Sequence, residues 1–70
     1  MERKKLNSTR IRSAGYDAKA QILEIEFSDG KIIQYSGVSQ EVNRQFMAAP
    51  SPVSFYEDKI AESYREKRLK

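Results

Sequence analysis

Two arginines near the amino terminus have the type and spacing of a phosphate-contacting strand. Arg10 and Arg12 are separated by one residue and follow the small polar residues 7–9, Asn-Ser-Thr. Contacts to nucleic-acid phosphates come from arginine, lysine, hydroxyl groups and backbone amides alike. We therefore interpret this run as a candidate phosphate contact. The alternative is that the charges only protect a weak edge strand from aggregation.

The net charge of +3 conceals a segregation of charge along the chain. Six basic side chains stand against two acidic ones in residues 1–20, three against seven in residues 21–62, and four against one in residues 63–70. Two basic ends could form one phosphate-binding patch if they lie close together in the fold. Solvated tails that keep a small domain soluble are the more common arrangement. The candidate nucleic-acid contacts are Lys4, Lys5, Arg10, Arg12, Lys67 and Arg68.

The other polar side chains do not combine into a catalytic or metal-binding set. The serines have no histidine to activate them, and a chain without cysteine or histidine nearly excludes structural zinc. Glu24 and Glu26 resemble a carboxylate pair, but we expect solubilising charges on an exposed sheet face, because acid–base catalysis needs a pocket that perturbs the pKa. Tyr16 is interpreted as a residue that closes the sheet edge beside a turn. We expect no enzyme, metal, cofactor or small-molecule substrate.

The strongest structural signal is a pair of alternating runs, residues 21–27 and 32–35, joined by a turn that contains Asp29-Gly30. Asp-Gly between two such runs is typical of a β-hairpin. A three-residue loop, residues 28–30, with Gly30 in a left-handed conformation gives both strands one apolar face. A register shifted by one residue would bury Glu24 and Glu26. The predicted pairs are Phe27–Lys31, Ile25–Ile33 and Leu23–Tyr35.

Further elements flank this hairpin. Residues 7–16 are a weak first strand, Ser39 is a good N-cap for a helix over 40–49, and Ser51-Pro52 begins a second helix that runs to about Arg65. The pattern predicts an α+β fold, in which a three-stranded antiparallel meander is packed on one face by two C-terminal helices. The expected parts are a basic tail (1–6), one domain (7–66) and a second basic tail (67–70). The expected core is Leu23, Ile25, Phe27, Ile33, Tyr35, Val42, Phe46, Tyr56 and Ile60.

Length and composition limit how this domain can be stabilised. A chain of 70 residues has room for one domain and buries only about 60% of the surface that its unfolded form exposes. Without disulfides it depends on a small core, so self-association is an open possibility. No apolar run approaches the roughly 20 residues that a membrane span needs. We expect a cytoplasmic protein without a membrane partner.

A set of residues in and around the hairpin and in the two helical segments forms a recognisable pattern: Asn7-Ser8, Ile11, Gly15-Tyr16-Asp17, Leu23-Glu24-Ile25-Glu26-Phe27, Gly30, Tyr35, Val38, Val42, Ala49, Ser51, Phe55-Tyr56 and Ile60. Through these residues, the segment from Asn7 to Tyr64 resembles the KTSC domain family. That family is named after a module at the C-terminus of some lysyl-tRNA synthetases and includes small stand-alone bacterial proteins. Its function is unassigned, and the synthetase context implies RNA binding.

Two segments depart from that family's pattern. Its usual Tyr-x-Tyr pair is replaced by Ile33-Gln34-Tyr35, and residues 57–62 are acidic where related sequences are more basic. Aromatic rings on a sheet can stack on bases, but the hairpin register assigns Ile33 and Tyr35 to the core. The prediction is a small non-enzymatic accessory module that binds RNA through phosphates. The alternative is a protein-interaction module or homodimer that uses a sheet edge or the Phe55 side of the second helix.

Overall fold

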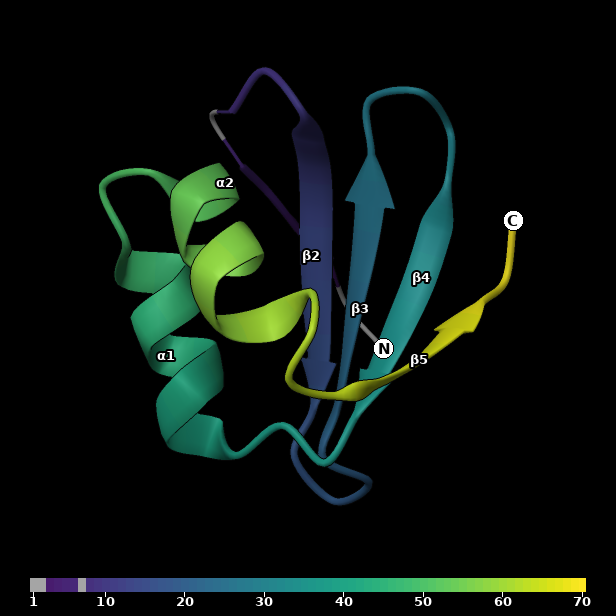
Figure 1. Cartoon of the computed structure of the whole chain (residues 1–70), viewed down its shortest axis with the longest axis vertical. Coiled ribbons are helices and arrows are strands. Elements are labelled where there is room, and N and C mark those ends of the chain that lie inside the picture. Colours follow the sequence, from purple (N-terminus) through teal and green to yellow (C-terminus); the bar gives the residue numbers. More distant parts are fainter. Residues whose placement is uncertain (1–2, 7) are drawn as a thin grey trace.

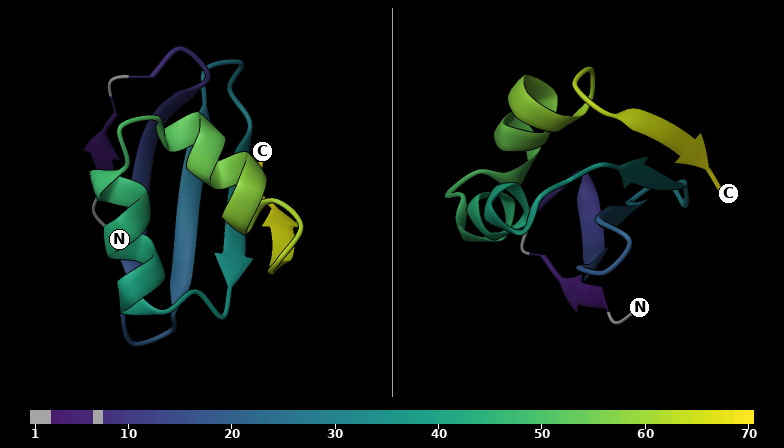
Figure 2. Two further views of the ribbon diagram at one scale, coloured as in Figure 1. Left: turned by 60° about the vertical axis from the view of Figure 1, so that its left-hand side comes forward. Right: turned by 90° about the horizontal axis from the view of Figure 1, so that it is seen from below.

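A five-stranded antiparallel sheet is covered on one side by helices in the computed structural model, which describes residues 3–6 and 8–70 (Figure 1). The strands are neighbours in the order in which they follow along the chain. Figure 2 shows both helical segments on the same side of the sheet. The strands are β1 (Arg3–Lys5), β2 (Ile11–Asp17), β3 (Ile22–Phe27), β4 (Ile32–Ser36) and β5 (Arg65–Arg68); the helices are α1 (Gln40–Ala48), α2 (Pro52–Phe55) and the π-helical segment η1 (Tyr56–Ile60).

The central hairpin β3–β4 has the predicted register. The backbone N–H of Phe27 donates to the carbonyl of Lys31 (2.8 Å), and the N–H of Gly30 donates to the carbonyl of Phe27 (3.0 Å). Gly30 has a φ of 96°, as a left-handed loop residue requires. Leu23 pairs with Tyr35 and Ile25 with Ile33, which confirms the three-residue loop.

The core lies between the sheet and the helices, on the face predicted from the hairpin. Five members of the expected core, Leu23, Ile25, Tyr35, Phe46 and Ile60, are fully buried. The other four are partly buried and pack against them: Phe27, Ile33, Val42 and Tyr56. Sequence reasoning left three fully buried residues out of its core, namely Ile11, Ala14 and Val38.

Local capping signals position the helices as expected. The Ser39 hydroxyl accepts a hydrogen bond from the N–H of Val42 (3.2 Å), and Ser51 caps the next helix by accepting from the N–H of Ser54 (3.4 Å). Pro52 is the first residue of α2, where its missing N–H costs nothing. Within the described ranges, no helix is long and apolar enough to cross a membrane.

The three-stranded meander predicted from the sequence is wrong, because the sheet has five strands. Residues at both ends of the chain add an edge strand each, β1 beside β2 and β5 beside β4. The second helix does not reach Arg65 either; η1 ends at Ile60 and the chain turns back along β4. Long-range backbone pairing, including a 2.7 Å bond from the N–H of Leu69 to the carbonyl of Ile32, overrides the local helical pattern.

The weak first strand is confirmed in part. The part of it that forms a strand is within β2, which begins at Ile11 and has a register irregularity between Ile11 and Ser13. Such a bulge places two successive side chains on one face of the sheet. Asn7, which we included in the candidate phosphate contact, lies outside the described residues.

Candidate nucleic-acid interface

The two lysines of β1 are directed to opposite sides of the sheet. Lys5 pairs with Ser13 and Lys4 with Ala14, and successive strand residues alternate between faces. Lys5 shares a shallow depression with Arg12 on the face away from the helices, whereas Lys4 lines a groove beside α1. The edge strand therefore carries ammonium groups on both of its sides.

The face away from the helices holds a cluster of charged residues around the two glutamates of β3. Arg3 Nε lies 2.6 Å from Glu24 Oε2, and Gln34 donates to Glu24 Oε1 at 3.0 Å. Glu26 accepts a hydrogen bond from Ser13 (2.9 Å) and lies 3.9 Å from Arg12 Nη1. The cluster joins β1 to the middle of the sheet.

Glu24 corrects one expectation from the sequence. We expected both glutamates to be exposed charges, but Glu24 is only 8% exposed because Arg3 lies against it. Burial raises the pKa of the Glu24 carboxyl, and the hydrogen bonds from Gln34 and Arg3 outweigh this effect, so that its pKa lies below the usual value. Glu24 is therefore a charged structural group that holds Arg3, rather than a solubilising one.

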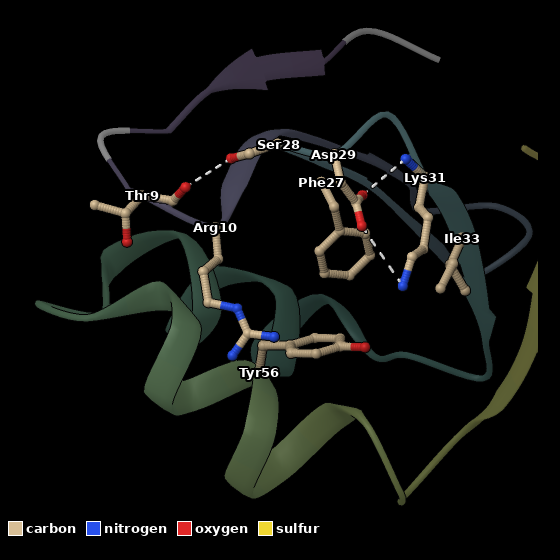
Figure 3. A pocket seen from close by; sticks show the side chains of 8 residues that line it. All are labelled: Thr9, Arg10, Phe27, Ser28, Asp29, Lys31, Ile33 and Tyr56. Atoms are coloured by element: carbon tan, nitrogen blue, oxygen red, sulfur yellow. Dashed lines mark hydrogen bonds and ion pairs between the residues drawn. The ribbon is translucent and has the colours of Figure 1, made fainter.

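A cavity of about 260 Å³ opens between the β3–β4 loop, the start of β2 and η1 (Figure 3). Figure 3 shows Arg10 and Tyr56 among the side chains that line it. Arg10 Nη1 lies 3.0 Å from Glu57 Oε1, and Lys31 Nζ lies 3.6 Å from Asp29 Oδ2. Both cations of this loop cavity therefore already have a carboxylate partner.

A larger groove of about 620 Å³ lies between α1 and the β1–β2 edge. Lys4 and Arg44 bring positive charge to it from the strand and the helix. The Oδ1 atom of Asn43 is buried and has no hydrogen-bond partner among the described residues. We call this site the α1 groove; it is lined by Lys4, Ala14, Gly15, Tyr16, Asn43, Arg44, Met47 and Ala48.

The tyrosines near these sites are occupied by structural contacts. The Tyr16 hydroxyl donates to the carbonyl of Val38, which ties β2 to the connection before α1 and agrees with a structural role. Burial, with a smaller contribution from Asp17, raises the pKa of Tyr16. Tyr35 is fully buried and its hydroxyl is bonded to that of Tyr56. Burial and this hydrogen bond raise the pKa of Tyr35. Because Tyr35 is buried and the ring of Tyr56 packs edge-on against it, neither ring is a free platform for stacking.

The six predicted contact residues do not gather in one patch. Lys4, Lys5 and Arg12 lie at the β1–β2 edge and Arg10 lies at the loop cavity. Lys67 and Arg68 lie on β5, at the opposite edge of the sheet. We expected Lys67 and Arg68 to join the N-terminal basic residues only if the two ends of the chain converge. On the sheet, the two ends lie at opposite edges and do not converge.

Sequence reasoning missed Arg44 and Asn43 of the α1 groove. Both lie on α1, outside its apolar stripe, where side chains are usually solvated. No local pattern signals that β1 brings Lys4 to the same place, because residues 4 and 44 are far apart along the chain. Arg3 was missed for a similar reason, since its contact with Glu24 spans 21 residues.

Known proteins resemble this chain in both sequence and structure. The family model of the KTSC domain matches residues 7–64. A curated protein of Stutzerimonas stutzeri (strain A1501), described as uncharacterized, is 45% identical over 51 residues, which are 73% of this chain and 72% of the relative. The crystal structure of a KTSC domain protein from Yersinia pestis has a TM-score of 0.93 and 33% identity, and the match covers 99% of this chain and 97% of that one.

Proposed function

This chain belongs to the KTSC domain family, and we propose that it is a small non-enzymatic accessory module that binds RNA through phosphate contacts at the β1–β2 edge of its sheet. The contacting residues in this proposal are Lys4, Lys5, Arg10 and Arg12. The curated relative is described as uncharacterized, so the proposal is based on the surface of this chain.

The observation that carries the proposal is the pair of lysines on the outermost strand. Lys4 and Lys5 are adjacent on β1 and point to its two sides. Among residues 3–6 and 8–70, no carboxylate lies within ion-pair distance of either ammonium group. A phosphate backbone running along this edge could contact both lysines without breaking an existing ion pair.

The two arginines extend the same surface towards the loop cavity. Arg12 is 58% exposed at its side chain and 3.9 Å from Glu26; Arg10 and its partner Glu57 are 72% and 53% exposed. Exposed ion pairs of this kind contribute about 0 to 1 kcal/mol. Phosphate oxygens can therefore replace these carboxylates at little cost.

The alternative function, protein interaction or homodimerisation, has less support from the surface. Large exposed apolar patches are typical of such interfaces. In the described part of the chain, Leu69 is the exposed large hydrophobic residue, at 46%. Phe55, suggested as a contact, is partly buried with its ring 6.1 Å from that of Phe46.

The test is a fluorescence-anisotropy titration of a labelled RNA hairpin with a single-stranded tail, at low and at moderate salt. We expect the affinity to fall steeply as the salt concentration rises. Each phosphate contact to a single strand contributes about 0.7 to the slope of log K against log salt, so the double variant Lys4→Ala/Lys5→Ala should reduce the magnitude of this slope by roughly 1.4.

The matched control is Lys67→Ala/Arg68→Ala, which removes the same charge from the opposite edge and should change the slope little. Absence of binding at low salt would overturn the proposal, as would equal losses in the two double variants. A dimer in sizing chromatography that persists at high salt, together with no RNA binding, would support the alternative.

A further inference from the structure

We propose that the α1 groove holds one unpaired base of the bound RNA strand and that the Asn43 amide forms hydrogen bonds with the edge of that base. This inference depends on the proposed RNA binding and adds to it a location and a class of ligand. It implies that single-stranded RNA is preferred over duplex, because a paired base cannot enter a groove of this kind.

The shape and lining of the α1 groove fit a base. Its volume of about 620 Å³ is within the range of roughly 300 to 1,000 Å³ that small-molecule sites occupy. Ala14, Met47 and the partly buried ring of Tyr16 supply apolar walls. A base is flat and largely apolar on its faces and presents donors and acceptors only at its edge. The groove therefore needs few polar groups to recognise it.

Asn43 supplies a polar group of this kind. Its Oδ1 atom is buried without a hydrogen-bond partner among the described residues. An unsatisfied buried acceptor is uncommon in a native structure and costs about 1 to 3 kcal/mol. Asn43 lines the α1 groove, and a half-turn about χ2 exchanges the positions of Oδ1 and Nδ2, so a base N–H in the groove could satisfy the oxygen once it faces outwards. An asparagine amide can also accept and donate at once to the edge of adenine.

Positive charges lie where the phosphates on either side of the base would run. Lys4 projects from β1 and Arg44 from α1, and both line the α1 groove. Neither forms an ion pair with a carboxylate in the described part of the chain. Lys4 belongs to the edge proposed to contact the phosphates, so the backbone and base contacts are continuous.

The loop cavity is a weaker candidate for the base. Its volume is less than half as large, and its two cations are held by Glu57 and Asp29. No unpartnered buried polar side-chain atom lines it among the described residues. The α1 groove combines the unsatisfied Asn43 oxygen, apolar walls, and two basic side chains that have no carboxylate partner among the described residues.

The experiment compares Asn43→Leu with wild type by anisotropy, using three labelled probes: a ten-nucleotide oligo(A), the same strand with abasic sites, and the oligo(A)·oligo(U) duplex. We expect Asn43→Leu to weaken oligo(A) binding about tenfold, which is within the range for loss of a bidentate base contact. Binding of the abasic strand and the dependence on salt should not change. Wild-type protein should bind the abasic strand about as weakly as the variant binds oligo(A).

Two controls separate this effect from misfolding. Asn43→Leu removes a buried oxygen that has no partner, so its melting temperature should equal or exceed that of wild type. Gln45→Leu, at an exposed position of the same helix, should leave oligo(A) binding unchanged. In the wild-type protein, the side-chain amide resonances of Asn43 should shift on addition of oligo(A) but not of the abasic strand.

The outcomes distinguish this inference from the proposed function. If no strand binds at low salt, both are overturned. If oligo(A) binds but Asn43→Leu binds it as well as wild type does, or if the abasic strand or the duplex binds equally well, RNA binding stands and the base site in the α1 groove is rejected.

Discussion

Glu24 shows how a single charged side chain can have a role that its neighbours in the chain do not indicate. Alternation along β3 places it on the face away from the helices, together with Glu26. Arg3, from the first strand, then lies against it, and Gln34 donates to its second oxygen. The carboxylate is thereby buried with its charge compensated, and it holds β1 on the sheet.

We expect Glu24 to contribute to the pH dependence of stability. Because its pKa is lowered in the folded state, its contribution is complete above the ordinary value of 4.5 and is lost as the pH falls through the folded pKa. Glu24→Gln cannot titrate and should reduce the free energy of unfolding at pH 7 by about 1 to 3 kcal/mol. Urea unfolding at several pH values measures this.

The difference between wild type and Glu24→Gln should shrink as the solution becomes more acidic. Glu62→Gln, at an exposed position, should follow the wild-type curve throughout. A constant difference between wild type and Glu24→Gln from pH 7 to pH 3 would contradict this role of Glu24.

At the scale of elements, the β3–β4 hairpin was predictable because its determinants are contiguous. The alternating residues decide which face is apolar, and Asp29 and Gly30 build the loop that sets the register. Asp29 Oδ1 accepts from the backbone N–H of Lys31 at 3.1 Å, and Gly30 takes the positive φ. The helix caps Ser39 and Ser51 are local in the same sense.

Replacement of Gly30 tests this hairpin. Gly30→Ala should lower the free energy of unfolding by about 1 to 2 kcal/mol, the cost of a left-handed backbone at a residue with a Cβ. An added methyl group would meet no atom within 4 Å, so the loss would be one of backbone conformation alone. Urea unfolding followed by circular dichroism gives the value. Gly30→Asn should lose less, since asparagine tolerates this conformation; equal losses in both variants would argue against this explanation.

At the scale of the whole molecule, the two ends of the chain complete the sheet at opposite edges. β1 covers β2, and β5 covers the outer edge of β4. The N–H of Ile32 donates to the carbonyl of Lys70, and the N–H of Leu69 donates back to the carbonyl of Ile32. These short, basic edge strands also present charges that oppose pairing with another molecule.

Deletion of residues 65–70 should therefore do more than remove charge. We expect a lower urea midpoint, because the backbone of β4 loses its partners, and self-association in sizing chromatography, because its edge becomes free to pair. The control Lys67→Ala/Arg68→Ala keeps the backbone of β5 and should change stability by less than about 0.5 kcal/mol. A truncated chain that is monomeric and as stable as wild type would contradict this role of β5.

The candidate site was predictable only in part. The basic residues of the first strands were found from composition alone, and their use in RNA binding stays a prediction. The α1 groove was not found, since Lys4, Asn43 and Arg44 come from segments that are adjacent only in the folded chain. The burial of Glu24 was missed for the same reason, because it depends on a residue 21 positions away.

The sequence by itself determined the hairpin register, the helix starts, the face that became the core and the family. Each of these follows from neighbouring residues, through alternation, turn conformation and capping, or from motifs along the chain. Only the tertiary structure decided that the sheet has five strands, that the basic ends lie at opposite edges, and that a groove forms beside α1. These features depend on backbone groups of distant segments pairing at the edges of β2 and β4, and such pairing leaves no local pattern in the sequence.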